Sequence, residues 1–134
     1  MLEAFRAVES RDTERLLELY HPDVEFYWPP SLPYGGAFHG ADVVEMSLRF
    51  RAVWDSLQPT AAERRMDPRV VACEGGEVVV QYFQRGIDPA GARFETEVLG
   101  LYEVRDRRFA RAHMFYFDLV GLSDFLRHAA KSSE

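Results

Sequence analysis

The stretch Arg108-Phe109-Ala110-Arg111-Ala112-His113-Met114-Phe115-Tyr116-Phe117-Asp118 decides the fold. One alternate set of its residues is Phe109, Arg111, His113, Phe115 and Phe117, and the other is Ala110, Ala112, Met114, Tyr116 and Asp118. Apolar residues therefore occur on both faces, whereas a strand with one face in water alternates apolar with polar residues. We expect a central strand, with a core or pocket on one face and a second covered surface on the other.

The composition is that of an ordinary globular protein, and its charge argues against nucleic-acid binding. The chain has 134 residues, which suits one domain over residues 1–134, and its net charge is −6. Its arginines are scattered and interleaved with acids, unlike the clustered cations that phosphate contacts need. Cys73 is the single cysteine, which fits a reducing cytoplasm, and we expect it to be a small buried side chain. No run approaches 18 apolar residues, so we expect no membrane contact.

The first part of the chain predicts helices, one strand and a loop. Helical spacing of apolar residues indicates a helix over residues 2–9 and a second that begins at Asp12 or Thr13 and includes Tyr20. Alternation predicts a strand over 24–28. Residues 31–40 are rich in Gly and Pro, so we expect a loop, and residues 41–57 predict the longest helix.

From Asp67 onward the period of the pattern changes to two. Strands are predicted at 69–73, 78–85, 93–104 and 108–118, joined by turns that contain Gly, Pro and Asp. A short terminal helix is predicted at 119–128. Helices followed by hairpin-linked antiparallel strands define an α+β plan. Such a sheet can curl around the helices and enclose a cone with an apolar interior.

Four short motifs resemble the nuclear transport factor 2-like superfamily, in its SnoaL-like, ketosteroid isomerase-like branch. They are Tyr20–Val24, Phe38–Gly40, Val98–Asp106 and Phe115–Leu119. The resemblance implies a curved mixed or antiparallel sheet wrapped around N-terminal helices as a cone. This is a cystatin-like α+β barrel with a short C-terminal helix. It also implies a conical pocket for an apolar small molecule and usually a dimer across the outer sheet face.

The catalytic residues of ketosteroid isomerases are absent at the positions that resemble theirs. Trp28 stands where those enzymes place a carboxylate base, and Gly100 stands where they place a protonated Asp that donates a hydrogen bond. Ala4 and Phe5 lie near the place of their oxyanion Tyr. The resemblance therefore implies the fold of that isomerase and argues against its mechanism.

Asp118 and His39 are the predicted catalytic pair. The resemblance to polyketide cyclases implies an acidic residue near the end of the last strand, assisted by a His. Asp118 is the carboxylate that matches the first role, and we expect His39 to reach in from the loop. Two alternatives stay open. Asp118 can instead cap the terminal helix, and His39 can anchor the loop by a hydrogen bond.

Aromatic and aliphatic side chains are predicted to form the ligand-binding walls. These residues are Trp28, Phe38, Phe50, Trp54, Tyr82, Val98, Tyr102, Met114 and Tyr116. The tyrosine hydroxyls are expected either to donate to a ligand carbonyl or to bond to one another or to the backbone. The four histidines show no metal spacing such as His-x-x-x-His, so no metal is predicted, and no cofactor motif occurs.

Three functions remain open from the sequence. The first is a cofactor-independent isomerase, cyclase or hydrolase that uses acid–base chemistry on an apolar small molecule. The second is a non-catalytic module that binds such a molecule. The third is a dimerisation domain with a filled cone. In each case we expect a homodimer that buries Phe115, Phe117 or Leu101, because the last strand is apolar on both faces.

Overall fold

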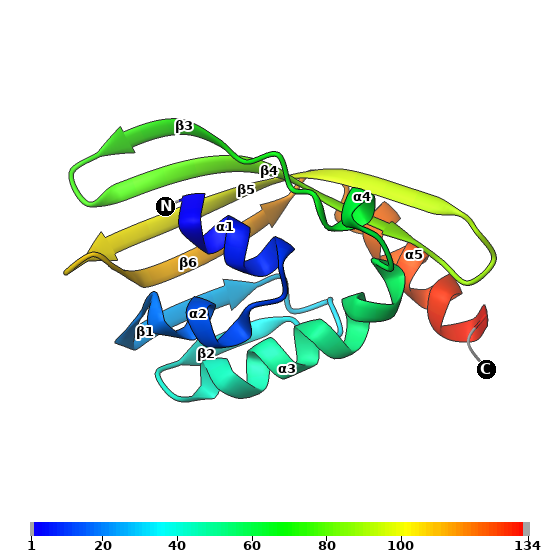
Figure 1. Ribbon diagram of the computed structural model, residues 1–134, viewed down its shortest axis with the longest axis horizontal. Coiled ribbons are helices and arrows are strands. Elements are labelled where there is room, and N and C mark those ends of the chain that lie inside the picture. The colour runs from blue at the N-terminus through cyan, green and yellow to red at the C-terminus, as the bar shows by residue number, and fades with distance from the viewer. Residues whose placement is uncertain (1, 133–134) are drawn as a thin grey trace.

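The computed structural model describes residues 2–132 and shows one curved sheet wrapped around helices (Figure 1). In chain order the elements are α1 (Leu2–Glu9), α2 (Thr13–Glu18), β1 (Tyr20–Trp28), β2 (Gly36–His39), α3 (Asp42–Trp54), a 3-10 turn (Asp55–Leu57), α4 (Ala61–Arg64), β3 (Arg69–Glu74), β4 (Glu77–Ile87), β5 (Arg93–Arg105), β6 (Arg108–Tyr116) and α5 (Leu119–Ser132). The predicted α+β class is confirmed.

Strand β6 holds the sheet together. The strand order is β2-β1-β6-β5-β4-β3, and β6 pairs parallel with β1 and antiparallel with β5. All other neighbours are antiparallel. Because β6 has a strand on each side, the prediction of a central strand is confirmed. The N-terminal strands thereby join the C-terminal hairpins in one sheet.

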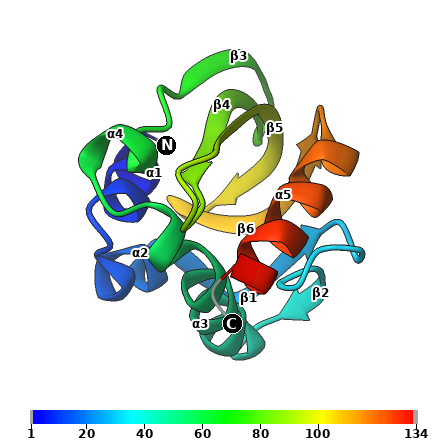
Figure 2. The ribbon, with the colours of Figure 1, turned by 90° about the vertical axis from the view of Figure 1, so that its right-hand side faces the viewer.

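The concave face of the sheet carries the apolar core. Strands β4 and β5 alternate between buried and more exposed residues along their central parts, as expected for a sheet with one covered face. In register, Tyr82 lies opposite Val98, and Val98 lies opposite Tyr116. Figure 2 shows the sheet curving, with α1, α2 and α3 against its inner side.

Helix α5 packs across one end of this core. Leu122 is fully buried, and the ring of Phe125 stacks on Phe94 with centroids 5.4 Å apart. A Cβ added at Gly86 would lie only 2.9 Å from Trp54, so the small residue in β4 lets the helix and the indole approach the strand. Trp54 and Phe125 therefore pack directly against the strand at Gly86.

Two predicted boundaries near the N-terminus are wrong. Tyr20 begins β1 instead of ending a helix, because its backbone lies opposite Phe109 of β6 and its ring packs on Phe26 with centroids 5.8 Å apart. The predicted loop 31–40 contains β2, which pairs with the end of β1. A Cβ at Gly35 would lie 1.9 Å from the carbonyl oxygen of Pro29, so only glycine permits this close turn.

Other differences concern the long helix, the last strand and Cys73. The α-helical part of 41–57 ends at Trp54, and α4 follows with a capping box between Thr60 and Glu63 that the periodicity did not reveal. Strand β6 ends at Tyr116, and α5 continues to Ser132, beyond the predicted end at 128. Cys73 is exposed, not buried, because it lies on edge strand β3, all of whose residues are exposed.

The outer surface of β6 is not covered within this chain. Phe115 is 50% exposed, and Phe117, which follows the strand, is 87% exposed. The expected second covered surface is therefore open in the single chain. None of the helices within residues 2–132 is long and apolar enough to cross a membrane.

Candidate functional site

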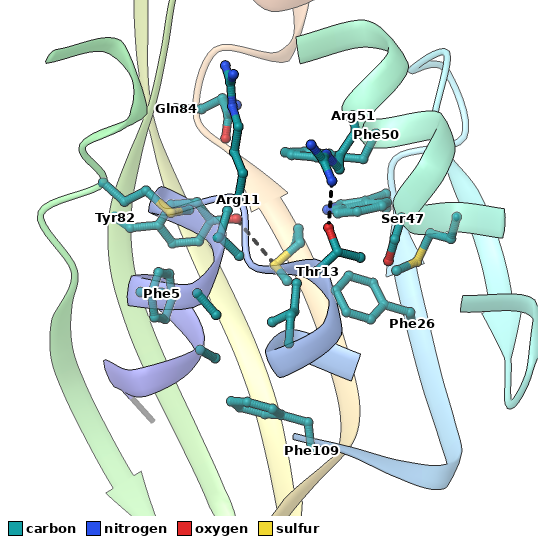
Figure 3. Close-up of a pocket in the computed structure, with 18 of the residues that line it drawn as sticks. Phe5, Arg11, Thr13, Phe26, Ser47, Phe50, Arg51, Tyr82, Gln84 and Phe109 are labelled. Carbon is teal, nitrogen blue, oxygen red and sulfur yellow. Dashed lines mark hydrogen bonds between the residues drawn. The ribbon is translucent and has the colours of Figure 1, made fainter. Parts of the chain in front are cut away.

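A cavity of about 110 Å³ lies between the N-terminal helices and the concave sheet (Figure 3). Its walls come from α1, α2, α3 and the inner faces of the strands. Most of its lining is apolar; the aromatic members are Phe5, Tyr20, Phe26, Trp28, Phe50, Tyr82, Tyr102 and Phe109. The cavity is therefore suited to an apolar or aromatic molecule.

Two tyrosine hydroxyls in the cavity share one weak acceptor. The hydroxyls of Tyr82 and Tyr102 both donate to the Met114 sulfur, at 3.5 and 3.6 Å. A thioether is a poor acceptor compared with an oxygen. The ring of Phe5 packs edge-on against Tyr82, with centroids 5.1 Å apart, and fixes its position. Burial raises the pKa of both tyrosines, so both are neutral donors at ordinary pH.

A second pair of tyrosines lies outside the cavity. The Tyr34 and Tyr116 hydroxyls are hydrogen-bonded to each other at 3.1 Å. Burial raises the pKa of Tyr34 to about 12, and burial also raises the pKa of Tyr116. Each of these two hydroxyls therefore has the other as its hydrogen-bond partner. Tyr116 thus bonds to another tyrosine, which is one of the two alternatives expected from the sequence.

One wall of the cavity is a stacked aromatic pair. The indole of Trp28 lies against Phe50 with centroids 5.2 Å apart and planes inclined by 14°. The buried Trp28 Nε1 has no hydrogen-bond partner within residues 2–132. Leaving a buried N–H unpaired costs roughly 1–3 kcal/mol. The wall thus combines aromatic surface with an unused donor.

The mouth of the cavity, which we define as Arg11, Thr13, Arg51, Asp55 and Gln58, is polar and partly exposed. Arg11 Nη2 donates to the main-chain oxygens of Asp55 and Gln58, at 2.9 and 2.6 Å. Arg51 Nη1 donates to Thr13 Oγ1 at 2.9 Å (Figure 3). Arg51 Nε donates to Asp55 Oδ2 at 3.2 Å. These bonds tie the α1–α2 connection to the end of α3.

The backbone of Arg11 supports the same arrangement. Its φ of 59° lies in the left-handed region, which costs a residue with a Cβ about 1–2 kcal/mol. The two bonds from Nη2 to main-chain oxygens of the 3-10 turn and of the residue after it hold Arg11 there. Strain of this kind persists only where surrounding contacts hold it, and it is frequent at functional sites.

Gln84 places a buried amide just inside the mouth. It lies on the inner face of β4, two residues after Tyr82, and its side chain is turned toward the cavity beside Arg11 in Figure 3. Gln84 is only 3% exposed, yet its Nε2 finds no hydrogen-bond partner in the described part of the chain. A buried amide without partners is rare in native structures and needs an explanation.

The cavity contains part of the predicted ligand-binding set. Five of those residues line it, namely Trp28, Phe50, Tyr82, Tyr102 and Met114. Four others do not, namely Phe38, Trp54, Val98 and Tyr116. Trp54 is part of the packing between α3 and α5, where it stacks on Phe125, and Val98 lies between Tyr82 and Tyr116 in the sheet.

Asp118 and His39 lie apart from the cavity lining. Asp118 is exposed, and its Oδ1 accepts a hydrogen bond from the Gly121 backbone N–H at 2.9 Å, which caps α5. His39 is exposed at the end of β2, opposite Glu25. Neither is among the residues that surround the cavity. In this structure Asp118 caps the terminal helix, which is one of the two alternatives expected for it.

The surroundings of Gly100 leave little space for a larger side chain at this position. A Cβ at Gly100 would lie 2.5 Å from the Tyr102 ring, because that ring folds back over the glycine. The space that an Asp side chain would need is therefore filled by tyrosine. Trp28, which the resemblance to ketosteroid isomerases matches to their base, is a buried indole.

Sequence reasoning missed the polar part of the site. Gln84 carried a signal, because it is a polar residue on the apolar face shared by Val78, Val80 and Tyr82. Arg11 and Arg51 carried none, because 40 residues separate them in the chain and only the packing of α3 beside the α1–α2 connection joins them.

The fold and cavity define a small α+β barrel of the nuclear transport factor 2-like class. The family model for the SnoaL-like domain matches residues 1–112, so the chain belongs to that family. The resemblance stated from the sequence is thereby confirmed. No curated protein matches the chain.

Solved structures with the same fold cover almost the whole chain. TerC, co-crystallised with polyporic acid, has a TM-score of 0.78 and 23% identity, and the alignment covers 94% of each chain. A protein of unknown function with a cystatin-like fold from Xanthomonas campestris has a TM-score of 0.74 and 21% identity, with 91% of each chain covered. A putative polyketide cyclase from Xanthomonas campestris pv. campestris has a TM-score of 0.66 and 18% identity, covering 92% of this chain and 89% of that one. At these identities the likeness shows the fold alone.

The buried tyrosines predict a loss of stability at alkaline pH. Burial raises the pKa of Tyr20, Tyr34, Tyr82, Tyr102 and Tyr116 above the ordinary value of 10.0. Above about pH 10 the unfolded chain releases phenolic protons that the folded chain keeps, so the free energy of unfolding falls as pH rises. Below about pH 10 this contribution is fully present. We expect the urea midpoint to drop between pH 9 and pH 11, about one unit on either side of the ordinary phenol pKa.

Absorbance at 295 nm measures the same transition directly. The phenolate signal of these five tyrosines should appear together with loss of the folded far-ultraviolet circular dichroism. Their ionisation near the ordinary pKa while the fold persists would contradict the burial that the structure shows.

Proposed function

We propose that the chain binds a small apolar molecule bearing an oxygen acceptor, and that Tyr82 and Tyr102 donate to that oxygen. The observation that carries this proposal is a pair of hydroxyls in an apolar cavity whose shared acceptor is the Met114 thioether. A carbonyl or other ligand oxygen accepts hydrogen bonds more strongly than sulfur does. Exchange of one acceptor for the other therefore favours the bound state.

The dimensions of the cavity support a ligand with a body of about one ring. The cavity measures about 110 Å³, and an apolar cavity of about 150 Å³ in another protein holds benzene. The parallel planes of Trp28 and Phe50 show that flat rings pack well on this wall. A fold neighbour, TerC, was co-crystallised with polyporic acid, which is consistent with small-molecule binding in this fold.

A reaction in the same cavity is the second candidate, as a cofactor-independent isomerisation, cyclisation or hydrolysis that uses Asp118 and His39. Likeness to a putative polyketide cyclase favours it. The distribution of the residues favours binding instead, because Asp118 and His39 are exposed and outside the cavity lining. Binding is therefore our first proposal, and turnover through Asp118 is the alternative.

We also propose that two copies pair through the outer sheet face. Leu99 and Phe115 lie directly opposite each other on β5 and β6, and they are 45% and 50% exposed. The ring of His113 stacks on Phe115 with centroids 4.3 Å apart and on its other side meets Tyr27. Such a contiguous apolar and aromatic surface is typical of a protein interface.

The exposed free thiol of Cys73 fits a reducing cytoplasm, which we propose as the location.

The hydroxyl pair predicts selectivity for an oxygen-bearing ring. We expect the chain to bind acetophenone more tightly than ethylbenzene, which has a similar shape and no oxygen. The double variant Tyr82→Phe, Tyr102→Phe should lose this preference, by about 3- to 10-fold for each hydrogen bond. Titration of the ¹⁵N-labelled protein by NMR measures both affinities. Tyr27→Phe, on the outer face, is the matched control. A double variant that keeps the preference would remove the hydroxyls from the site.

Two substitutions at Asp118 distinguish a helix cap from a catalytic acid. Because Asn caps a helix about as well as Asp, Asp118→Asn should keep the free energy of unfolding, whereas Asp118→Ala should lower it by about 1 kcal/mol. We expect both variants to bind acetophenone as the wild type does. A turnover assay with a candidate substrate tests the alternative: a folded Asp118→Asn protein that loses about a hundredfold in rate would support catalysis by Asp118.

The outer apolar face predicts a dimer that one charge disrupts. In light scattering at micromolar concentration we expect a mass near twice 15.4 kDa. Phe115→Glu should shift the protein to the monomer, because two carboxylates would face each other in an apolar contact. Val44→Glu introduces the same charge at an exposed apolar position on α3 and should leave the dimer intact. A wild-type monomer would refute the proposal.

A further inference from the structure

The cavity offers many hydrogen-bond donors and few unused acceptors. Trp28 Nε1 and Gln84 Nε2 are buried and have no partner within residues 2–132. The hydroxyls of Tyr82 and Tyr102 reach only a sulfur. The hydroxyl of Ser47 already donates to the Val43 carbonyl at 2.9 Å. A molecule that satisfies this lining must supply hydrogen-bond acceptors, such as oxygen atoms.

The charged residues at the mouth also favour a ligand that supplies hydrogen-bond acceptors. Among the described residues that line the cavity, the charged ones are Arg11, Arg51 and Asp55, which leaves one positive charge in excess. Both oxygens of the Asp55 carboxylate are engaged. Its Oδ1 lies 3.6 Å from Arg11 Nε, and its Oδ2 lies 3.2 Å from Arg51 Nε. The mouth therefore has little left to offer a cationic group.

The guanidinium groups of Arg11 and Arg51 each have N–H donors with no acceptor among residues 2–132. Arg51 uses Nε and Nη1 in its bonds, and Arg11 uses Nη2 and approaches Asp55 with Nε. Within residues 2–132, Nη2 of Arg51 and Nη1 of Arg11 have no hydrogen-bond acceptor. The buried amide of Gln84 lies on the inner side of the same mouth. These three groups come from the α1–α2 connection, α3 and β4 and surround one opening.

We propose that this mouth binds an anionic acid group. The ligand is then an apolar molecule with a body of about one ring that bears one ionised acid group, such as a carboxylate. The inference rests on the proposed function, because it assigns the end of the ligand that stays at the mouth while its ring enters the cavity. Arg51 provides charge-assisted hydrogen bonds to the acid, and Gln84 provides a neutral donor from inside. Arg11, fixed by its bonds to main-chain oxygens, adds the second positive charge. Pairing the ligand with Gln84 also removes the desolvation cost of an unpaired amide.

The test compares two ligands that differ in charge and share the same single ring. Isothermal titration calorimetry measures the dissociation constants of benzoate and of its neutral counterpart benzamide at pH 7.5. We expect the wild type to bind the carboxylate at least about tenfold more tightly, as charge-assisted hydrogen bonds require. Arg51→Gln should remove about tenfold of that preference and change the affinity for the amide little.

Matched variants separate this effect from a general loss of structure. Arg49→Gln removes a positive charge two residues away on α3, from an exposed side chain bonded to Glu45 and outside the cavity, so the preference should stay. Gln84→Leu should weaken binding of benzoate, while the thermal midpoint of the variant stays equal to that of the wild type or rises, since the substitution deletes an unpaired buried amide.

Three outcomes would overturn the inference. Equal affinity for the two ligands would remove the acid site and leave the apolar cavity as the binding site. A preference that falls equally in Arg49→Gln and Arg51→Gln would assign it to the general charge of the protein. Binding of neither ligand would refute both the acid site and the proposed function.

Discussion

The pairing of β6 with β1 is the contact on which the rest of the structure depends. Tyr27 lies opposite His113 in a parallel register, whereas the rest of the sheet is antiparallel. Without this pair the N-terminal half and the β3–β6 hairpins would be separate layers. With it, α1, α2 and α3 are held against the concave face, because β1 follows α2 directly and β2 leads into α3. The cavity is the space that remains between these helices and the curved sheet.

The distribution of polar groups follows from that geometry. Side chains from the middle of the strands are buried among aromatics, so their hydroxyls and amides must find partners inside the chain or in a ligand. The Tyr34–Tyr116 pair finds its partner internally. Tyr82 and Tyr102 reach a sulfur, and Gln84 Nε2 reaches nothing in the described part of the chain.

Local pattern predicted most of the fold but only half of the site. The strands around 78–85 and 93–104 follow from strict alternation and clear turn residues, and the inward Tyr82 and Tyr102 follow from the same alternation. Strand β2 did not, because it has only four residues and depends on pairing with β1 rather than on its own sequence. Asp118 shows a related difficulty. A carboxylate at a strand end and a helix start satisfies both a catalytic and a capping pattern, and only the position of the cavity separates them.

The polar residues of the mouth could not be predicted from the sequence, and the reason is a different one. Arg11, Arg51 and Asp55 come together through helix packing and main-chain carbonyls, which leave no periodic trace in a sequence. Their arrangement is also unfavourable for the isolated chain, since Arg11 holds a left-handed backbone and Gln84 holds an unpaired buried amide. Each of these costs on the order of 1–3 kcal/mol, a notable part of a domain's stability of about 5–15 kcal/mol. Replacing the amide with an apolar side chain of similar size would remove its cost at once. The acid-bearing ligand that we propose would pair with the buried amide of Gln84 and so offset its cost, which makes the occupied fold more stable than the empty one.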